Sequence, residues 1–309
     1  MNQEHTPSKD WTARELLEWT EGYFRRQQIP SARLDAEILL AKALGVDRLG
    51  LLTKEFEELV DEDCRAAFRE LVKRRGKKEP VAYLTGEKEF YSLPFEVTPA
   101  VLTPRPETEF LVDEALALAR ELPGERLRFL DLGTGSGNIA VSLAVNAPTA
   151  EITAVDISPE ALEVARRNAK KNNVEDRISF LEGDLFDALP PGGAPFDLIA
   201  SNPPYIAAAE EESLMDDVRL FEPRIALVDS RNPDGDGLGF FRAICEGLED
   251  WLSESGAVIV ETGESQAASV GQLFEAQGLQ DVSITRDYAK IPRIVCARRE
   301  KEANSPRQT

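Results

Sequence analysis

The stretch Leu130-Asp131-Leu132-Gly133-Thr134-Gly135-Ser136-Gly137 joins an apolar segment to a helix-forming one. Residues 127–132 predict a buried strand, and residues 138–145 predict the helix that follows it. Glycines at such a turn let a ligand approach the backbone closely, because they carry no side chain. The stretch therefore predicts a strand–turn–helix unit with a binding site at the turn.

Strands and helices alternate along the chain beyond this turn. Further strands are expected at residues 152–156, 178–181, 196–200 and 257–261, with a closing antiparallel pair at 282–284 and 294–297. Helices are expected after Ser158-Pro159 and over residues 240–252 and 270–276. This alternation is typical of an α/β fold with a doubly wound, Rossmann-like sheet that is mostly parallel.

The first eighty residues show a different pattern. Residues 10–78 predict helices, with a capping box at Thr12 and Glu15. Aromatic segments at 83–86 and 90–97, punctuated by Gly and Pro, predict a short hairpin, and a helix is expected over 110–122. We therefore expect a small helical domain over 1–79, a hairpin linker over 80–104, an α/β domain over 105–299 and a disordered tail over 300–309.

The net charge of −20 is unevenly distributed. Residues 1–80 hold 15 Lys and Arg against 16 Asp and Glu, whereas residues 81–309 hold 21 against 40, a net charge of −19. Phosphate contacts from basic side chains supply most of the affinity for nucleic acid, so the acidic part is a poor nucleic-acid binder. Adaptation to a high-salt cytoplasm and a simple solubilising surface remain two interpretations of the excess acid.

Cysteine, histidine and hydropathy patterns exclude several other classes of protein. Cys64, Cys245 and Cys296 lie far apart and fit neither a metal site nor a disulfide pattern. The only histidine is His5, so histidine-based triads and zinc sites are not expected. No apolar run approaches the roughly 20 residues that cross a membrane, and the first residues lack the features of a secretory signal. We expect a cytoplasmic protein without a metal and without membrane association.

Two acidic residues at strand ends accompany the glycine turn. Asp156 ends the strand after the turn, where a carboxylate can accept both hydroxyls of a ribose. Asp184 ends the next strand, where it can receive an adenine amino group, with Leu185 against the ring. Together these residues predict a cofactor that contains a nucleoside.

The spacing of the glycines distinguishes between such cofactors. The dinucleotide fingerprint is G-x-G-x-x-G, whereas this turn has G-x-G-x-G with Asp131 just before it. An acid there would repel a pyrophosphate and suits a cationic ligand without phosphate, such as S-adenosylmethionine, whose product is S-adenosylhomocysteine. The residues expected to bind it are Asp131, Gly133, Thr134, Gly135, Ser136, Gly137, Asp156, Asp184, Leu185 and Asn202.

A second motif, Ser201-Asn202-Pro203-Pro204-Tyr205-Ile206, follows the apolar strand at 196–200. The two prolines fix φ and supply no N–H donor, so they form a stiff bracket whose carbonyls can accept hydrogen bonds. Asn202 can orient a planar polar group, and Tyr205 can cover it. By itself the motif is equally compatible with a Pro-rich turn that closes a strand.

The glycine turn and the Asn-Pro-Pro-Tyr motif together resemble class I methyltransferases that methylate planar amino or amide nitrogens. A wider set of motifs resembles one family, the release-factor glutamine methyltransferases (the PrmC/HemK family), over residues 10 to about 299. These motifs are Arg33-Leu-Asp-Ala-Glu37, Pro80-Val-Ala-Tyr-Leu-Thr-Gly86, Glu89-Phe-Tyr91, Leu102-Thr-Pro-Arg-Pro-Glu-Thr-Glu109, Phe221-Glu-Pro-Arg224, Asp236-Gly-Leu238 and Glu261-x-Gly-x-x-Gln266.

The resemblance implies methyl transfer to the side-chain amide N5 of the glutamine in the Gly-Gly-Gln motif of class I peptide-chain release factors. We further expect residues 1–79 to recognise the release factor and the enzyme to be a monomer without a nucleic-acid partner. Accepting both amide N–H groups, at Asn202 and at a proline carbonyl, would hold a poorly nucleophilic nitrogen in line. The expected catalytic and substrate-binding residues are Asn202, Pro203, Pro204 and Tyr205, with Arg105 at the rim.

Several alternatives remain open. Arg105, Glu107 and Thr108 either line the rim of the pocket or include an Arg–Glu structural pair, and Glu261 is expected to be structural. The Asn-Pro-Pro-Tyr motif also serves adenine-N6 nucleic-acid methyltransferases, although this chain shows no basic groove and no large insertion after the motif. The third interpretation is a non-catalytic module that binds a nucleoside, and the intact Asn202 argues against it.

Overall fold

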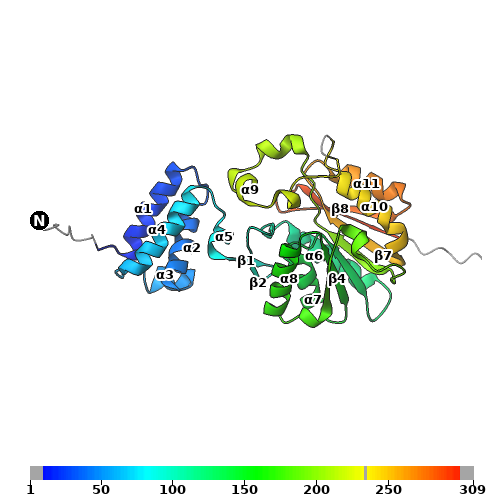
Figure 1. The fold of residues 1–309 in the computed structure, drawn as a ribbon, viewed down its shortest axis with the longest axis horizontal. Helices are drawn as coiled ribbons and strands as arrows, with labels where there is room; N and C mark the ends of the chain where they lie inside the picture. The colour runs from blue at the N-terminus through cyan, green and yellow to red at the C-terminus, as the bar shows by residue number, and fades with distance from the viewer. Residues whose placement is uncertain (1–9, 233–234, 300–309) are drawn as a thin grey trace, which may run out of the picture. The chain divides into compact units, whose positions relative to one another are not determined.

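The computed structural model describes residues 10–232 and 235–299. His5 and the tail expected over 300–309 lie outside the described residues. Contacts within the chain divide it into two units, both drawn in Figure 1. One unit extends to Gly86 and includes Asp216–Phe221, and the other comprises Glu87–Met215 and the chain from Glu222 onward. The domain boundaries expected at residues 79 and 104 stay predictions.

Helices build the first unit, as the pattern over residues 10–78 predicts. The capping box forms at the start of α1, where Thr12 and Glu15 each accept from the other's backbone N–H group. Apolar side chains of α1, α2 and α4 form a common core, and a buried ion pair joins Asp35 to Arg75 at 2.7 Å. The helices are α1 (Ala13–Arg26), α2 (Ala32–Leu44), α3 (Arg48–Thr53), α4 (Glu62–Gly76), α5 (Val81–Thr85) and α9 (Asp216–Phe221).

The structure differs from the sequence prediction between residues 81 and 97. Residues 83–85, predicted as part of a hairpin, form the end of helix α5. Thr85 donates from Oγ1 to the carbonyl of Val81, and Gly86 ends the helix with a positive φ of 77°. The hairpin is shorter and consists of β1 (Glu87–Phe90) and β2 (Leu93–Glu96). A short apolar run does not by itself distinguish a strand from a single helical turn.

The second unit contains the predicted α/β sheet. The strands of the described chain lie in the order β5-β4-β3-β6-β7-β9-β8. Strands β3 to β7 are parallel, and β9 runs antiparallel between β7 and β8. The mostly parallel, Rossmann-like sheet with an antiparallel last strand is therefore confirmed. Its strands are β3 (Arg128–Leu132), β4 (Glu151–Asp156), β5 (Ile178–Glu182), β6 (Phe196–Ser201), β7 (Leu252–Glu261), β8 (Gln280–Arg286) and β9 (Pro292–Arg298).

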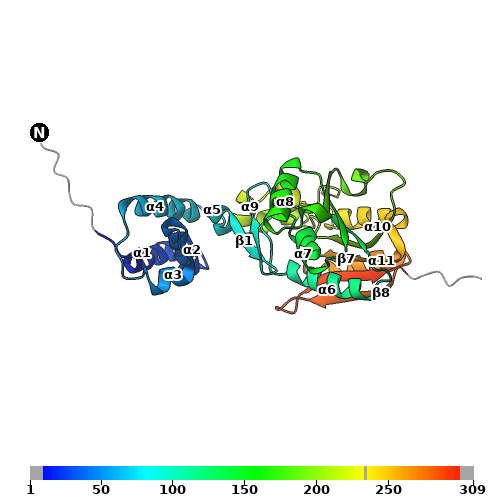
Figure 2. The same ribbon diagram turned by 90° about the horizontal axis from the view of Figure 1, so that it is seen from below.

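Helices cover both faces of this sheet (Figure 1, Figure 2). One apolar core joins one face to α6, α7 and α8, and a second core joins the other face to α10 and α11. These helices are α6 (Thr108–Glu121), α7 (Asn138–Asn146), α8 (Pro159–Lys171), α10 (Gly239–Trp251) and α11 (Ala267–Ala276). Short 3₁₀ turns are η1 (Glu175–Arg177), η2 (Leu185–Ala188), η3 (Ala208–Ser213) and η4 (Arg224–Ala226). Over residues 10–232 and 235–299, every helix is too short or too polar to cross a membrane.

The order of the strands reverses between β3 and β6. Strands β4 and β5 extend the sheet on one side of β3, whereas β6 and β7 extend it on the other. Ligands of doubly wound sheets bind outside the carboxyl ends of the strands at such a switch point. The glycine turn follows β3 and the Asn-Pro-Pro-Tyr motif follows β6, so the topology brings both motifs to one crevice.

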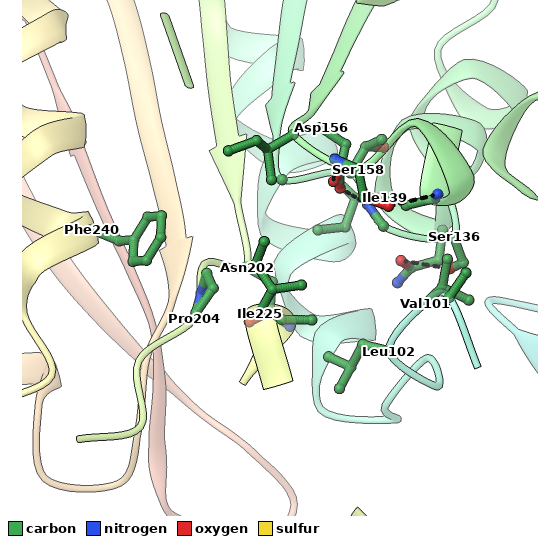
Figure 3. A pocket seen from close by; sticks show the side chains of 18 of the residues that line it. Val101, Leu102, Ser136, Ile139, Asp156, Ser158, Asn202, Pro204, Ile225 and Phe240 are labelled. Carbon is green, nitrogen blue, oxygen red and sulfur yellow. Dashed lines mark hydrogen bonds between the residues drawn. The ribbon is translucent and has the colours of Figure 1, made fainter. Parts of the chain in front are cut away.

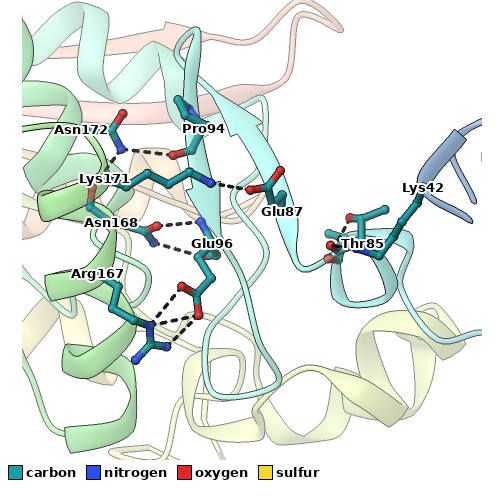
Figure 4. Close-up of polar contacts among 10 residues, drawn as sticks. Lys42, Thr85, Glu87, Pro94, Glu96, Arg167, Asn168, Lys171 and Asn172 are labelled. Carbon is teal, nitrogen blue, oxygen red and sulfur yellow. Dashed lines mark hydrogen bonds and ion pairs between the residues drawn. The ribbon is translucent and has the colours of Figure 1, made fainter. Parts of the chain in front are cut away.

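Asn168 on α8 attaches the hairpin to the glycine turn, and Figure 4 shows its contacts with the hairpin. Its buried side chain accepts from the backbone N–H of Glu96 at 2.6 Å and donates to the carbonyls of Glu96 and Ser136 at 2.9 and 2.8 Å. Arg167 also pairs with the carboxylate of Glu96, and Lys171 pairs with Glu87. Strand β2 and the turn that follows β3 are thereby fixed to the same helix.

Candidate active site

A cavity of about 250 Å³ opens at the switch point, along the carboxyl ends of β3, β4, β5 and β6. Figure 3 shows Asn202 and Pro204 between Phe240 and the edge formed by Asp156 and Ser158. Much of the wall is apolar, including Val101, Leu102, Ile139, Leu185 and Ile225. The glycine turn and the Asn-Pro-Pro-Tyr motif therefore contribute to one cavity.

The glycines of the turn have different roles. Gly133 and Gly135 line the cavity with positive φ angles of 71° and 54°, and a Cβ atom at either position would meet no atom within 4 Å. A ligand can therefore lie directly against their backbone. A Cβ atom at Gly137 would instead lie 3.1 Å from the Cβ of Ala165 on α8, so this glycine allows close helix packing.

Asp131 lies beneath the turn and does not line the cavity. Its side chain is fully buried, and Oδ2 accepts from Thr134 Oγ1 at 2.6 Å and from the backbone N–H of Ala140 at 3.1 Å. Oδ1 is buried and has no hydrogen-bond partner in the described part of the chain. Burial raises the pKa of Asp131 to about 7, although both hydrogen bonds favour the charged form. Asp131 thus ties the turn to the first turn of α7.

Asp156 lies at the edge of the cavity. Its two oxygens accept from the backbone N–H groups of Gly135 at 2.7 Å and Ser158 at 2.9 Å. Burial raises the pKa of Asp156, and these hydrogen bonds oppose that rise. A carboxylate has about four acceptor sites, so the hydroxyl groups of a ribose can still bind.

Asp184 and Leu185 line the cavity beyond Asp156. The Asp184 carboxylate forms an ion pair with Arg231, whose guanidinium also lies 5.0 Å from the centre of the Phe240 ring. The ion pair engages Oδ1 of Asp184, so an adenine amino group would bind through Oδ2 or compete with Arg231. This competing arginine was not expected from the sequence.

The lining fits a nucleoside with a cationic group better than it fits a diphosphate. The basic side chains that line the cavity are Arg105 and Arg231, and each is paired with a carboxylate, Glu222 and Asp184 respectively. A pyrophosphate would thus find acidic groups and neutralised arginines. S-adenosylmethionine meets these conditions, because Asp156 can take its ribose and the open glycine turn leaves room for its amino-acid portion.

A chain of side-chain hydrogen bonds holds Asn202. Its Nδ2 donates to Thr108 Oγ1 at 3.2 Å, and Thr108 Oγ1 donates to Glu261 Oε2 at 2.5 Å. Thr108 and Glu261 are buried, and Asn202 is half-buried. Asn202 and Thr108 both line the cavity, whereas Glu261 lies behind them. Burial raises the pKa of Glu261 to about 7, while the bond from Thr108 and the charge of Arg293 act in the opposite direction.

The rest of the motif is divided between the cavity and the core. Pro204 lines the cavity, whereas Pro203 is buried and Tyr205 is not part of the lining. The carbonyl of Tyr205 accepts from Gln266 Nε2 at 2.9 Å, and its ring packs beside the core of α10 and α11. Gly237 leaves the necessary space, because a Cβ atom there would lie 2.2 Å from the Tyr205 carbonyl oxygen. The packing of Tyr205 on a substrate amide stays a prediction.

Arg105 lines the cavity and also forms a structural ion pair, so both alternatives left open by the sequence apply to it. Its Nη2 lies 2.8 Å from both carboxylate oxygens of Glu222, whose side chain is buried. The partner is therefore a distant residue rather than Glu107, which stands at the N-cap position of α6 without a side-chain capping hydrogen bond. No local spacing in the sequence indicated this pairing.

The cavity brings together most of the residues predicted for the site: Arg105, Gly133, Thr134, Gly135, Ser136, Asp156, Asp184, Leu185, Asn202 and Pro204. Asp131, Gly137, Pro203 and Tyr205 support the site from outside its lining. Sequence reasoning missed Arg231, Phe240 and Ser158. Ser158 carried a usable signal, because it follows Asp156 and caps α8.

Two family models match separate parts of the chain. The model described as PrmC N-terminal domain matches residues 15–86, and the model described as Methyltransferase domain matches residues 124–277.

Curated relatives match over nearly their whole length. The release factor glutamine methyltransferase of Geobacter sulfurreducens is 42% identical over 288 residues, which cover 93% of this chain and 97% of that protein. The release factor glutamine methyltransferase of Rhodopirellula baltica is 43% identical over 288 residues, which cover 92% of this chain and 95% of that protein.

Among solved structures, the hMettl16 catalytic domain in complex with a MAT2A 3'UTR hairpin has a TM-score of 0.53 at 17% identity, covering 70% of this chain and 79% of that one. This last likeness shows the fold alone.

Proposed function

The chain belongs to the release factor glutamine methyltransferases, and from this premise we propose how its site performs the reaction. The enzyme transfers a methyl group to a glutamine side chain of a release factor. We infer that the acceptor atom is N5 of the glutamine in the Gly-Gly-Gln motif of class I release factors, and that the donor is S-adenosylmethionine. The observation that carries this inference is the placement of Asn202 and Pro204 beside the glycine turn in one cavity.

Residues on the β3, β4 and β5 side of the cavity would hold the methyl donor. Gly133 and Gly135 leave room against the backbone, Asp156 would accept the ribose hydroxyls, and Leu185 would contact the adenine. When bound, S-adenosylmethionine supplies a sulfonium-linked methyl group that a nucleophile can attack. The remaining task of the protein is to prepare the glutamine amide.

The Asn-Pro-Pro segment would prepare that amide. An amide nitrogen is a poor nucleophile, because its lone pair is delocalised into the carbonyl group. Asn202 Oδ1 would accept one N–H hydrogen, and a backbone carbonyl of Pro203-Pro204 would accept the other. Both acceptors orient the nitrogen and stabilise the positive charge that develops on it during transfer. The prolines suit this task, because they bring no competing N–H group.

No side chain has to remove a proton before transfer. The nitrogen becomes strongly acidic once it carries the additional methyl group and a positive charge, so one of its hydrogens then leaves to water. Burial raises the pKa of Tyr205, so the phenol stays protonated at neutral pH and does not act as a base. The absence of a histidine among residues 10–232 and 235–299 is compatible with this order of events.

Charge favours a protein acceptor over a nucleic acid. Residues 81–309 carry a net charge of −19, and the two arginines of the cavity are neutralised by Glu222 and Asp184. An adenine-N6 enzyme would need free cations to hold the phosphate backbone near the site.

The direct test is transfer of a radiolabelled methyl group from S-adenosylmethionine to intact release factor, with duplex DNA and structured RNA as competing acceptors. We expect label only in the release factor, within the peptide that contains the Gly-Gly-Gln motif. A release factor with that glutamine replaced by glutamate is the matched control and should take up none. Label confined to nucleic acid would support an adenine-N6 enzyme, and no label in any acceptor would support a non-catalytic binding module.

We assign recognition of the release factor beyond its Gly-Gly-Gln loop to the helical first unit, which extends to Gly86. Trp19 on α1 is 52% exposed and stacks on Tyr23 with the ring centroids 5.6 Å apart, which offers a flat apolar contact. Trp19→Ala should raise the KM for intact release factor and leave the KM for a short Gly-Gly-Gln peptide unchanged. An equal change for both acceptors would refute this role.

A further inference from the structure

We propose that Thr108 and Glu261 are positioning residues that fix the carboxamide of Asn202, so that its Oδ1 faces the glutamine amide of the substrate. The proposal rests on the function proposed above, because it assigns a cause to the orientation that Asn202 needs there.

The three side chains come from three separate elements. Asn202 follows β6, Thr108 begins α6, and Glu261 ends β7, the strand next to β6. Asn202 Nδ2 lies 3.2 Å from Thr108 Oγ1, which lies 2.5 Å from Glu261 Oε2. Thr108 is 1% exposed and Glu261 is 2% exposed, so water does not compete for these contacts. The chain of contacts therefore runs from the protein interior to the wall of the cavity.

The direction of the hydrogen bonds follows from the chemistry of the groups. An ionised carboxylate only accepts, so Thr108 must donate its single hydroxyl proton to Glu261. The Thr108 oxygen then has only lone pairs left for Asn202, which must present Nδ2 to it. Because a carboxamide has its oxygen and nitrogen on opposite sides, Oδ1 is left for the cavity.

This orientation matters for the reaction. A substrate amide nitrogen carries two hydrogens, so it needs acceptors around it as positive charge develops. If Asn202 were turned over, Nδ2 would face that nitrogen, and two donors would meet without an acceptor. The carboxamide of a solvent-exposed asparagine can turn over readily, whereas Thr108 beside an ionised Glu261 admits one orientation.

The chain of hydrogen bonds from Glu261 through Thr108 to Asn202, called the relay below, also predicts that enzyme activity depends on pH. Burial raises the pKa of Glu261 to about 7. The charged and titratable groups that face it are Arg293 from β9, Arg105 and Glu107 from the segment before α6, and the phenol of Tyr205. Protonated Glu261 could donate to Thr108, whose own proton would then be free to point at Oδ1 of Asn202 and select the reversed orientation. Activity should therefore rise as the pH rises through about 7.

Valine and serine substitutions at Thr108 test the relay. Thr108→Val keeps the shape and removes the hydroxyl, so we expect kcat to fall about 100-fold, the scale of a misplaced reacting group. The KM for release factor and the dissociation constant of S-adenosylhomocysteine, measured by calorimetry without turnover, should change less than threefold. Thr108→Ser keeps the hydroxyl and should retain kcat within about threefold.

Two further variants complete the set. Glu261→Gln should lower kcat and abolish the rise of kcat around pH 7, because a carboxamide does not titrate. Thr285→Val is the matched control. Thr285 Oγ1 donates at 2.8 Å to Glu114 on α6, the helix that also carries Thr108, but neither Thr285 nor Glu114 lines the cavity. We expect its kcat and its pH profile to match those of the unsubstituted enzyme.

Each outcome bears on the proposal separately from the proposed function. Wild-type kcat in Thr108→Val together with an inactive Asn202→Ala would overturn the relay and leave the role of Asn202 intact. An active Asn202→Ala would overturn the role of Asn202 and the relay with it, whereas the absence of label from the release factor would overturn the proposed function. If Thr108→Val does not fold, the serine variant and the wild-type pH profile decide, and a kcat that is flat between pH 6 and 8 would contradict the proposal.

Discussion

The cavity is flanked by two buried carboxylates that look alike and serve different halves of the site. Asp131 lies in β3 near its carboxyl end and Glu261 ends β7, on either side of β6. Each is fully buried, each accepts from a threonine hydroxyl, and burial raises the pKa of each to about 7. Neither lines the cavity, so both act through neighbouring residues.

The two carboxylates differ in how far along the sequence their hydrogen-bond partners lie. Asp131 binds Thr134 and Ala140, three and nine residues further along the chain, within one strand–turn–helix unit. Glu261 binds Thr108 across 153 residues, and Thr108 in turn binds Asn202 across 94. The half of the site that would hold the cofactor is thus built locally, whereas the half that would hold the amide is assembled by the tertiary fold.

The largest effect should come from the amide half. Asn202→Ala should lower kcat about 1000-fold, because the substrate nitrogen loses an acceptor in the transition state. The dissociation constant of S-adenosylhomocysteine should stay within about twofold, which isothermal calorimetry can measure. Asn146→Ala is the control, since the Asn146 side chain donates to the carbonyl of Ser142 on its own helix. A collapse of cofactor affinity in Asn202→Ala would show that the two halves are not separable.

The corresponding change in the cofactor half should affect binding first. Asp156→Asn should raise the dissociation constant of S-adenosylhomocysteine about 10- to 100-fold, the worth of a hydrogen bond to a charged group. The kcat at saturating cofactor should fall much less than in Asn202→Ala. Asp187→Asn, at an exposed position of η2, should change neither quantity. Loss of kcat with unchanged affinity would assign Asp156 to the amide half instead.

The stabilising contributions of the two buried carboxylates, Asp131 and Glu261, should change with pH in the same direction. The folded protein holds a proton on Asp131 up to about pH 7, whereas an unfolded aspartate loses it near pH 4. The stabilising contribution of this group is therefore complete below about pH 4 and is lost as the pH rises through about 7.

Asp131→Asn removes this titration. Its thermal midpoint, relative to that of the unsubstituted enzyme, should rise between pH 5 and pH 8, and Glu261→Gln should show the same trend. Only Glu261→Gln should also change the pH dependence of kcat. A relative midpoint that does not vary with pH would contradict the raised pKa of the carboxylate concerned.

The smallest effect is expected at Arg231. Its ion pair with Asp184 is partly exposed, with 31% and 46% of the two side chains accessible, so it contributes little energy. Arg231→Ala should tighten the binding of S-adenosylhomocysteine up to about threefold. In the variant, the Asp184 carboxylate no longer has to give up its ion pair with Arg231 when the ligand binds. The difference between variant and unsubstituted enzyme should shrink at high salt, which screens the pair. Weaker binding in the variant would mean that Arg231 itself contacts the ligand.

Most of the cofactor half could be predicted from the sequence. The positions of Gly133, Gly135 and Asp156 follow from strand and turn patterns that span few residues, and all three line the cavity. The exception is Asp131, which was expected to face the ligand but is buried beneath the turn. The Asp131 side chain instead accepts a hydrogen bond from the backbone N–H of Ala140 on α7, the helix that packs on this face of β3.

The amide half was predicted less completely. Asn202 and Pro204 were placed in the cavity by their motif, but Glu261 had no visible link to them in the sequence. The pairing of Arg105 with Glu222 was equally hidden, because the two residues are 117 positions apart. The single turn of α5 was mistaken for part of a hairpin, because a short apolar run is compatible with either a strand or a helical turn.

The α/β class, the glycine turn and the motif after β6 follow from short stretches of sequence, because backbone conformation and hydrophobic period depend on neighbouring residues. The contacts of Asn202 with Thr108, and of Thr108 with Glu261, arise from tertiary folding. Contacts of this kind depend on the order of strands in the sheet and on how α6 packs over it, which no short stretch of sequence specifies. Buried polar groups must find hydrogen-bond partners wherever the fold places them, and here those partners set the orientation of the residue on which the proposed reaction depends.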